Sequence, residues 1–168
     1  PVIAGNVKVK GGIVHIVDGI ITSPDVTSNQ LNLIERVREE ESLSLFVSII
    51  DLLGLSSLLE EGESFTIFAP TDDAFKAYAR AQGMTDAEAL LAQPEALLPI
   101  IDLHIISGEL LETMALLELM TLESNGGPVS VSSEQGEIYI EGGQVIRGDL
   151  NASNGVLHLI SAVIERSE

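Results

Sequence analysis

The feature of this chain that most constrains its fold is a change in the spacing of its apolar residues near Leu119. Before that point, apolar residues recur mostly at the three- and four-residue spacing of amphipathic helices. After it, short apolar stretches alternate with glycine-containing turns such as Asn125-Gly126-Gly127, which is typical of a meander of strands. Helices followed by strands, without regular alternation of the two, predict an α+β fold.

The first part of the chain contains several helix signals. Amphipathic spacing predicts a helix over Asn29–Glu40, and Ser42 is the expected N-cap of a second helix that ends at Gly54. Thr71 is the expected N-cap of a later helix with carboxylates in its first turn. A short helical turn and two further helices are expected at Leu55–Leu59, Asp86–Ala92 and Pro94–Asp102.

Strands are expected on both sides of this change. Phe65–Ala69 is rich in β-branched and aromatic residues and is ended by Pro70, and the apolar run Leu103–Ser107 predicts a short strand that carries His104. The later meander is expected to contain Leu119–Glu123, Pro128–Ser132, Glu137–Glu141, Gln144–Asp149 and Val156–Ile160.

An internal repeat links the two ends of the chain. Val2–Ile21 resembles Val145–Ile164 without a gap, 143 positions apart, with identical Val, Ile, two Gly and His residues. Two short strands joined by a glycine turn are predicted in each copy. We expect residues 1–23 to be the strand-rich tail of an upstream domain and residues 24–168 to form one complete domain. The alternative is an N-terminal extension that is rich in strands without being part of such an array.

Composition excludes several classes of function. Twenty-six acidic residues against eight Lys and Arg give a formal charge of −18, which excludes charge-driven binding to nucleic acids or anionic membranes. The chain has no Cys, so disulfides, thiol catalysis and Cys-ligated metals are excluded. The longest apolar stretches, 43–53 and 97–106, each contain an Asp and are too short to span a bilayer.

Two sequence motifs resemble a known family, the fasciclin-like or FAS1 domain. Its first signature is similar to Phe65-Thr66-Ile67-Phe68-Ala69-Pro70-Thr71-Asp72-Asp73-Ala74-Phe75, and its second is similar to Asn154-Gly155-Val156-Leu157-His158-Leu159-Ile160. His104 lies where the family carries a Tyr-His pair, and the resemblance extends over about residues 26–164. The family-motif residues are therefore Phe65, Thr66, Phe68, Ala69, Pro70, Thr71, Asp72, Phe75, His104, Asn154, Gly155 and His158.

The resemblance implies a wedge-shaped β-sandwich or barrel with a cluster of N-terminal and inserted helices. It also implies a non-enzymatic adhesion or matrix-interaction module that is secreted, extracellular or on the cell surface, or periplasmic in a bacterium. Such domains commonly occur in tandem, and the upstream copy of the repeat resembles the end of a preceding FAS1 domain. The implied partner is a protein or a glycan.

The sequence departs from the family pattern at two places. Leu103 replaces the usual Tyr before His104, and Ser161 and Ala162 replace the polar continuation of the second signature. Because some animal members engage integrins through these regions, the resemblance does not extend integrin binding to this chain. The candidate partner contacts are Leu103, His104, Ile105, Arg147, Gly148 and Asp149.

The titratable residues do not form a recognisable catalytic or metal motif. His104 and His158 lie in predicted apolar strands, so each is expected to be a hydrogen-bonded core residue. Asp102, His104 and Ser107 include the residue types of a catalytic triad, but strand alternation would place Ser107 on the opposite face. The polar run 149–155 resembles a calcium loop, but Ile160 stands where that loop needs an acid. We therefore predict neither an enzyme nor a metal site.

Three alternatives stay open at this point. The first is a carrier of a carotenoid or another apolar ligand, held by the helical face around Phe46, Ile49, Leu53, Leu90, Leu91, Leu97 and Leu98. The second is self-association through residues 2–21, which could occupy the place of residues 145–164 in a neighbouring molecule. The third concerns short motifs: Arg147-Gly148-Asp149 is a tripeptide that some integrins bind, and Asn151-Ala152-Ser153 is a glycosylation acceptor. We interpret the tripeptide as a coincidence.

Overall fold

The computed structural model describes residues 2–9, 12–17, 31–60 and 64–165, with side chains described only in the last two ranges. Its strands are β1 (Val2–Val9), β2 (Gly12–Val17), β3 (Phe65–Pro70), β4 (Ile105–Ser107), β5 (Thr121–Ser124), β6 (Gly127–Glu134), β7 (Glu137–Ile140), β8 (Gly143–Ala152) and β9 (Gly155–Ile160). Its helical segments are α1 (Leu33–Glu39), η3 (Glu41–Leu43), α2 (Ser44–Leu52), α3 (Ser56–Glu60), α4 (Asp72–Ala81), η4 (Ala87–Ala92), α5 (Pro94–Leu103) and α6 (Thr113–Leu116).

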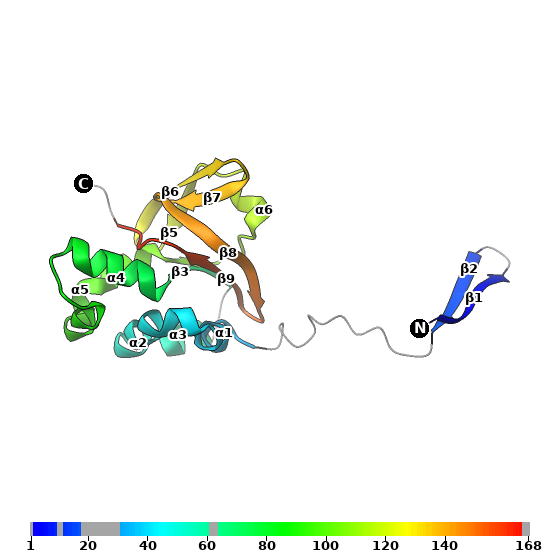
Figure 1. Cartoon of the computed structure of the whole chain (residues 1–168), viewed down its shortest axis with the longest axis horizontal. Helices are drawn as coiled ribbons and strands as arrows, with labels where there is room; N and C mark the ends of the chain where they lie inside the picture. The colour runs from blue at the N-terminus through cyan, green and yellow to red at the C-terminus, as the bar shows by residue number, and fades with distance from the viewer. Residues whose placement is uncertain (1, 10–11, 18–30, 61–63, 166–168) are drawn as a thin grey trace.

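One sheet of seven strands organises residues 64–165. Its order is β4-β3-β9-β8-β7-β6-β5, and it curves into a nearly closed barrel (Figure 1). All neighbours are antiparallel except β3 and β9, which run parallel. The two edges approach where the Asn125 N–H, in the turn after β5, donates to the Ile105 carbonyl of β4 at 2.9 Å. The predicted α+β class and the meander of five later strands are confirmed.

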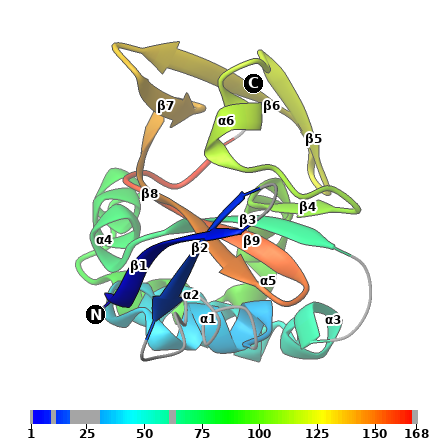
Figure 2. The ribbon, with the colours of Figure 1, turned by 90° about the vertical axis from the view of Figure 1, so that its right-hand side faces the viewer.

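The strands β3 and β9 lie between two apolar cores, so every residue in both is buried. Figure 2 shows α1, α2 and α3 on one side of these strands, and β5, β6, β7 and α6 on the other. Strands covered on both faces are near-continuous apolar runs, as here. The helical core includes Leu33, Ile34, Phe46, Ile49, Phe75 and Ile101, and the barrel core includes Phe68, Leu111, Leu116, Val129, Ile138 and Ile160.

The first helix starts later than the apolar spacing predicts. Within the described residues α1 begins at Leu33, and Asn32 is its N-cap. The Asn32 side chain accepts from the Glu35 N–H at 2.9 Å, and the Glu35 carboxylate accepts from the Asn32 N–H at 2.9 Å. This reciprocal pair is a capping box, which fixes a helix start. The predicted start at Asn29 lies outside the described residues, as do the loop before it and residues 61–63 of the acidic connector.

Ser42 is not the N-cap of the second helix. It lies inside the short segment η3, and α2 begins only at Ser44. The start of α2 is instead bound by Asp72, whose carboxylate accepts from the Leu45 N–H at 2.9 Å and from the Ser44 hydroxyl at 2.7 Å. The partner is therefore 27 positions away in sequence from Leu45, so local spacing could not identify it.

His104 does not lie in a strand. Helix α5 continues through Leu103, His104 is its C-cap, and β4 begins at Ile105. A short buried helix and a short buried strand are both apolar runs, so periodicity alone does not separate them. The predicted strand alternation of Asp102, His104 and Ser107 is wrong for the same reason. Arg147, Gly148 and Asp149 lie within β8, in agreement with the strand expected at Gln144–Asp149.

The backbone of β1 and β2 repeats that of β8 and β9. Each of the pairs between β1 and β2, from Val2↔Val17 to Val9↔Gly12, becomes a pair between β8 and β9 when 143 is added to both numbers. The two register shifts also fall at the same places in both hairpins. Sequence similarity at the two ends of the chain therefore corresponds to the same local geometry.

Candidate interaction surface

The residues of the first signature connect elements of the fold. The Thr71 hydroxyl accepts from the Ala74 N–H at 3.4 Å and caps α4, while Asp72 caps α2. Phe75 stacks on Phe46 across the helical core, with ring centroids 6.5 Å apart. These three motif residues therefore orient helices relative to one another, and of their side chains only the half-buried Asp72 borders an open groove.

The second signature has a comparable structural role at the turn between β8 and β9. The Asn154 side chain accepts from the Leu33 N–H and donates to the Leu59 carbonyl, both at 2.7 Å. At Gly155, an added Cβ would lie 2.5 Å from the Phe65 carbonyl oxygen, closer than van der Waals contact allows. The turn thus joins α1, α3 and β3, and it admits no side chain at Gly155.

His158 binds the segment before α6 to the sheet. Its Nε2 donates to the Leu111 carbonyl at 2.7 Å, its Nδ1 accepts from the Asp149 N–H at 3.4 Å, and its ring stacks on Phe68. Burial is the main cause that lowers the pKa of His158, and the Leu111 carbonyl opposes it. His158 is therefore a neutral, hydrogen-bonded core residue, as the sequence predicts.

Two further contacts hold the same segment. The buried Thr66 hydroxyl donates to the Glu109 carbonyl at 2.8 Å and accepts from the Leu111 N–H at 2.9 Å. The Asp149 carboxylate accepts from the Thr113 N–H at 2.7 Å. Because the Thr66 contacts are shielded from water and the Asp149 contact adds a further constraint, the backbone around α6 has a defined position.

His104 is also a neutral core residue. Its Nδ1 donates to the Ile100 carbonyl at 2.7 Å, and its Nε2 accepts from the Ile164 N–H at 3.0 Å. Burial lowers the pKa of His104 to about 4, and the bond to Ile100 opposes this shift. Leu103, His104 and Ile105 are all buried, so these candidate contacts cannot meet a partner directly in this conformation.

Arg147 and Asp149 are exposed, whereas Gly148 between them is constrained. The Arg147 guanidinium is paired with Glu40 at 2.8 Å, and Asp149 adopts a left-handed backbone with φ of 57°. A Cβ at Gly148 would lie 2.7 Å from the Thr113 hydroxyl and 2.9 Å from His158 Nδ1. Each residue of this tripeptide therefore has a role in the fold, and binding of a partner there stays a prediction.

Two grooves flank α6, and sequence analysis did not identify either. The first, of about 540 Å³, lies between α6 and the turn of β8 and β9 and is lined by Leu110, Glu112, Met114, Ala115, Asn151, Ala152, Gly155 and Val156. The second, of about 290 Å³, is lined by Thr113, Gly136, Glu137, Ile138, Gln144, Val145, Ile146, Arg147 and Gly148. We call them the linker-side groove and the Arg147 groove. The signal that could have found the linker-side groove is the pair of large apolar residues Leu110 and Met114, which the fold leaves exposed.

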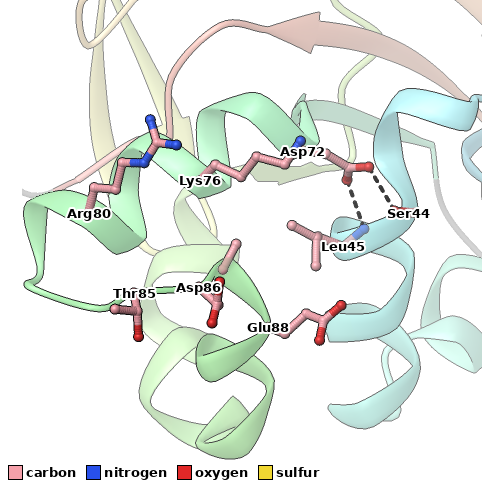
Figure 3. A pocket seen from close by; sticks show the side chains of 9 residues that line it. Ser44, Leu45, Asp72, Lys76, Arg80, Thr85, Asp86 and Glu88 are labelled. Carbon is pink, nitrogen blue, oxygen red and sulfur yellow. Dashed lines mark hydrogen bonds between the residues drawn. The ribbon is translucent and has the colours of Figure 1, made fainter.

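A third groove, of about 630 Å³, is polar and lies between α2, α4 and η4 (Figure 3). Lys76 and Arg80 line one side, and Asp86 and Glu88 line another. Lys76 forms an exposed ion pair with Asp73 at 2.9 Å, and exposed pairs of this kind contribute little stability. This groove therefore presents both positively and negatively charged side chains, which could donate and accept hydrogen bonds to a polar ligand.

The helical face predicted for an apolar ligand is used for packing. Phe46, Ile49, Leu90 and Leu97 are buried in the helical core, so they do not line an open cavity. Within residues 31–60 and 64–165, no group of three or more His, Asp or Glu side chains could hold a metal ion. In the same part of the chain, no helix has the length and apolar character needed to cross a bilayer.

With this geometry in view, comparison with known proteins decides the family. A family model described as "Fasciclin domain" matches residues 41–166. The chain belongs to the fasciclin domain family. The resemblance inferred from the two signatures is thereby confirmed.

Relatives of this fasciclin chain occur in bacteria and animals. "Protein sll1483" of Synechocystis sp. is 28% identical over 145 residues, which cover 86% of this chain and 78% of that protein. "Transforming growth factor-beta-induced protein ig-h3" of Sus scrofa is 31% identical over 159 residues, covering 91% and 21%. Periostin of Homo sapiens is 25% identical over 166 residues, covering 95% and 18%. The chain thus spans about a fifth of the length of these two animal relatives.

The fold also matches a solved structure. A FAS1 domain pair from the insect cell adhesion molecule Fasciclin I aligns with a TM-score of 0.66 and 17% identity, covering 98% of this chain and 59% of that one. The FAS1 fold predicted from the sequence is confirmed.

Proposed function

We propose that this fasciclin chain is a non-enzymatic adhesion or matrix-interaction module that acts outside the cell as part of a tandem array. The observation that carries the proposal is the family membership of residues 41–166. The matched Fasciclin I structure comes from a protein described as a cell adhesion molecule. An acidic surface with a formal charge of −18 also suits a module that must resist nonspecific association.

We place the partner contact at the Arg147 groove. Arg147 is exposed and is oriented by Glu40, while Ile146 beside it is 52% exposed. Arginine next to an exposed apolar side chain is a common composition of protein-binding surfaces. The groove is shallow and lies along a strand, so it suits a protein or glycan segment better than an enclosed small molecule.

The tandem arrangement has two supports. The hairpin of β1 and β2 repeats the register and both irregularities of β8 and β9. Gly5 and Gly12 of that hairpin correspond to Gly148 and Gly155, where contacts with Thr113, His158 and Phe65 leave no room for a Cβ. At Gly148 and Gly155 the need for glycine comes from contacts with other parts of the domain. The presence of glycine at both equivalent positions of the β1–β2 hairpin therefore favours the interpretation that this hairpin is part of a complete domain. We therefore propose residues 1–23 as the end of an upstream fasciclin unit and residues 24–168 as one unit.

The proposal is tested by attachment of cells, and by solid-phase binding of matrix proteins and glycans, to the immobilised chain. We expect Arg147→Ala and Ile146→Ser to reduce attachment at least several-fold, because each removes part of the same exposed surface. Arg80→Ala is the matched control, since Arg80 is an exposed arginine in the polar groove of Figure 3.

Two results would contradict the proposal. Absence of attachment to every surface tested would argue against an adhesion module. A loss caused by Arg80→Ala but not by Arg147→Ala would move the partner site to the polar groove. Circular dichroism of each variant verifies that the fold is retained, as expected for changes at exposed side chains.

A further inference from the structure

Three large apolar side chains beside the linker-side groove are exposed, and nothing in the proposed function uses them. Leu110 and Met114 are 54% and 74% exposed and line the groove. Leu117, the C-cap of α6, is 39% exposed and follows Met114 by three positions, which places both on one face of the helical turn. We call these three residues the apolar edge. Apolar side chains gathered in this way mark an interaction site more often than isolated ones do.

The fold holds the apolar edge on the outside of the domain. Leu111 and Leu116, which belong to the same segment, are buried in the barrel core. The Leu111 carbonyl also accepts from His158 Nε2 at 2.7 Å. Because these two leucines already fill the inward positions of a packed core, the apolar edge cannot turn inward without displacing them.

Acidic side chains border the apolar edge. Glu112 lines the groove itself, and Glu109 and Glu118 lie in the same segment; all three are exposed. Residues 81–146 contain no Lys or Arg. Arg147 lines the other groove beside α6, where it is held in an ion pair. The apolar edge is therefore bordered by negative charge.

This combination of an apolar edge and an acidic border complements an amphipathic helix that carries Lys or Arg beside its apolar face. Such a helix lays its apolar side chains into a groove, while the long stems of Lys and Arg cover apolar surface and their charged ends reach the acids. An extended strand would instead turn every second side chain away from the groove. The flexible side chain of Met114 also adapts readily to the side chains of a partner.

We propose that the linker-side groove binds a basic amphipathic helix of a partner protein, with the apolar face of that helix on the apolar edge and its Lys or Arg side chains beside Glu109 and Glu112. This surface is distinct from the Arg147 groove, and the inference goes beyond the proposed function without resting on it. Cell attachment and helix binding can therefore fail independently.

Fluorescence anisotropy of a labelled model peptide, titrated with the whole chain, tests the proposal. The peptide consists of Leu and Lys at helical spacing over about 18 residues, or five turns. A control peptide of the same composition has Leu and Lys in strict alternation, which is the pattern of an amphipathic strand. We expect the helical peptide to bind about tenfold more tightly, the effect expected for burying most of one further apolar side chain.

Substitutions in the apolar edge locate the site. Leu110→Ser together with Met114→Ser should weaken binding of the helical peptide about tenfold. The matched control is Leu52→Ser together with Leu58→Ser, because these leucines are 55% and 50% exposed and lie on α2 and α3, outside the groove. This control should leave binding unchanged.

A second pair of variants separates the acidic border from the net charge of the chain. Glu109→Gln together with Glu112→Gln should weaken binding several-fold and reduce its salt dependence. Glu95→Gln together with Glu134→Gln changes the net charge equally at exposed positions outside the groove, and should have a smaller effect. Equal effects of the two pairs would show that the whole acidic surface attracts the peptide, which contradicts the proposal.

Methyl NMR of the natural protein locates the peptide without any substitution. With ¹³C-methyl methionine, the signal of Met114 should shift during the titration, whereas that of Met84, outside the groove, should not. Three further outcomes would overturn the inference. They are equal binding of the two peptides, binding that survives the loss of Leu110 and Met114, and the absence of a shift at Met114.

Discussion

Individual residues of the two signatures act as structural connectors, and their chemistry explains why these residue types are present. His104 and His158 each use both ring nitrogens for hydrogen bonds with backbone groups. In each ring one nitrogen donates and the other accepts, so only the neutral form satisfies both contacts. Adding a proton to His104 would direct its Nε2–H at the Ile164 N–H, and a buried positive charge would have no partner there.

The pH dependence of stability follows from His104. Its pKa is lowered from 6.5 to about 4 in the folded protein, so the unfolded chain binds more protons between these values. The stability contribution is fully present above pH 6.5 and is lost as the pH falls toward about 4; the full loss is roughly 3 kcal/mol. Urea unfolding across this range should show His104→Gln to be less pH-sensitive than the natural protein. Equal pH dependence of the two proteins would contradict this assignment.

Gly155 gives a second prediction at this scale. A methyl group there would lie 2.5 Å from the Phe65 carbonyl oxygen and 2.8 Å from a Leu33 methyl carbon. The Phe65 oxygen belongs to the backbone of β3, which is held by hydrogen bonds to β4 and β9 and cannot move freely. Gly155→Ala should destabilise the domain by about 1–3 kcal/mol or more, the usual range for overpacking. Thermal unfolding checks this, with Ser153→Ala at the exposed neighbouring position as the control. A variant as stable as the control would show that β3 and β9 can separate at low cost.

At the scale of elements, helix α2 depends on a residue from another helix. It has no local side-chain cap, and Asp72 at the start of α4 instead accepts from the Leu45 N–H and the Ser44 hydroxyl in its first turn. The Asp72 carboxylate therefore lies in the first turn of α4 and also caps α2. This shared contact positions α2 and α4 side by side, and Phe46 and Phe75 stack between them.

The substitution Asp72→Ala should cost about 1 kcal/mol, the usual value for losing an N-cap, measured by urea unfolding. Asp73→Ala is the matched control, because Asp73 is the next residue and contacts only the exposed Lys76 in the described contacts. We expect the control to change stability by less than about 0.5 kcal/mol, as for other exposed ion pairs. Equal effects of the two substitutions would show that the contacts to Ser44 and Leu45 are not needed.

At the scale of the whole molecule, residues 31–60 and 64–165 contain both apolar cores. Every strand of the seven-stranded sheet also lies in that part of the chain. Strands β1 and β2 form a separate two-stranded sheet. The domain should therefore fold without the N-terminal hairpin.

Removal of residues 1–23 tests this expectation. The midpoint of thermal unfolding should stay within experimental error of that of the whole chain, because no strand of the main sheet is lost. Light scattering at several concentrations should show any self-association of the whole chain to be absent after the deletion. A large drop in the unfolding midpoint would show that the first 23 residues are an integral part of the domain.

The sequence by itself determined the α+β class, the family and most element positions, because these depend on local spacing and on short motifs such as Phe65–Phe75. It also predicted that both histidines are buried. Only the tertiary structure decided the cap of α2, the helical position of Leu103 and the two grooves beside α6. Each of these depends on residues far apart in sequence, such as Asp72 with Leu45 or Met114 with Asn151. Periodicity reports which face of an element is apolar, but only packing determines what that face contacts and which apolar residues stay exposed.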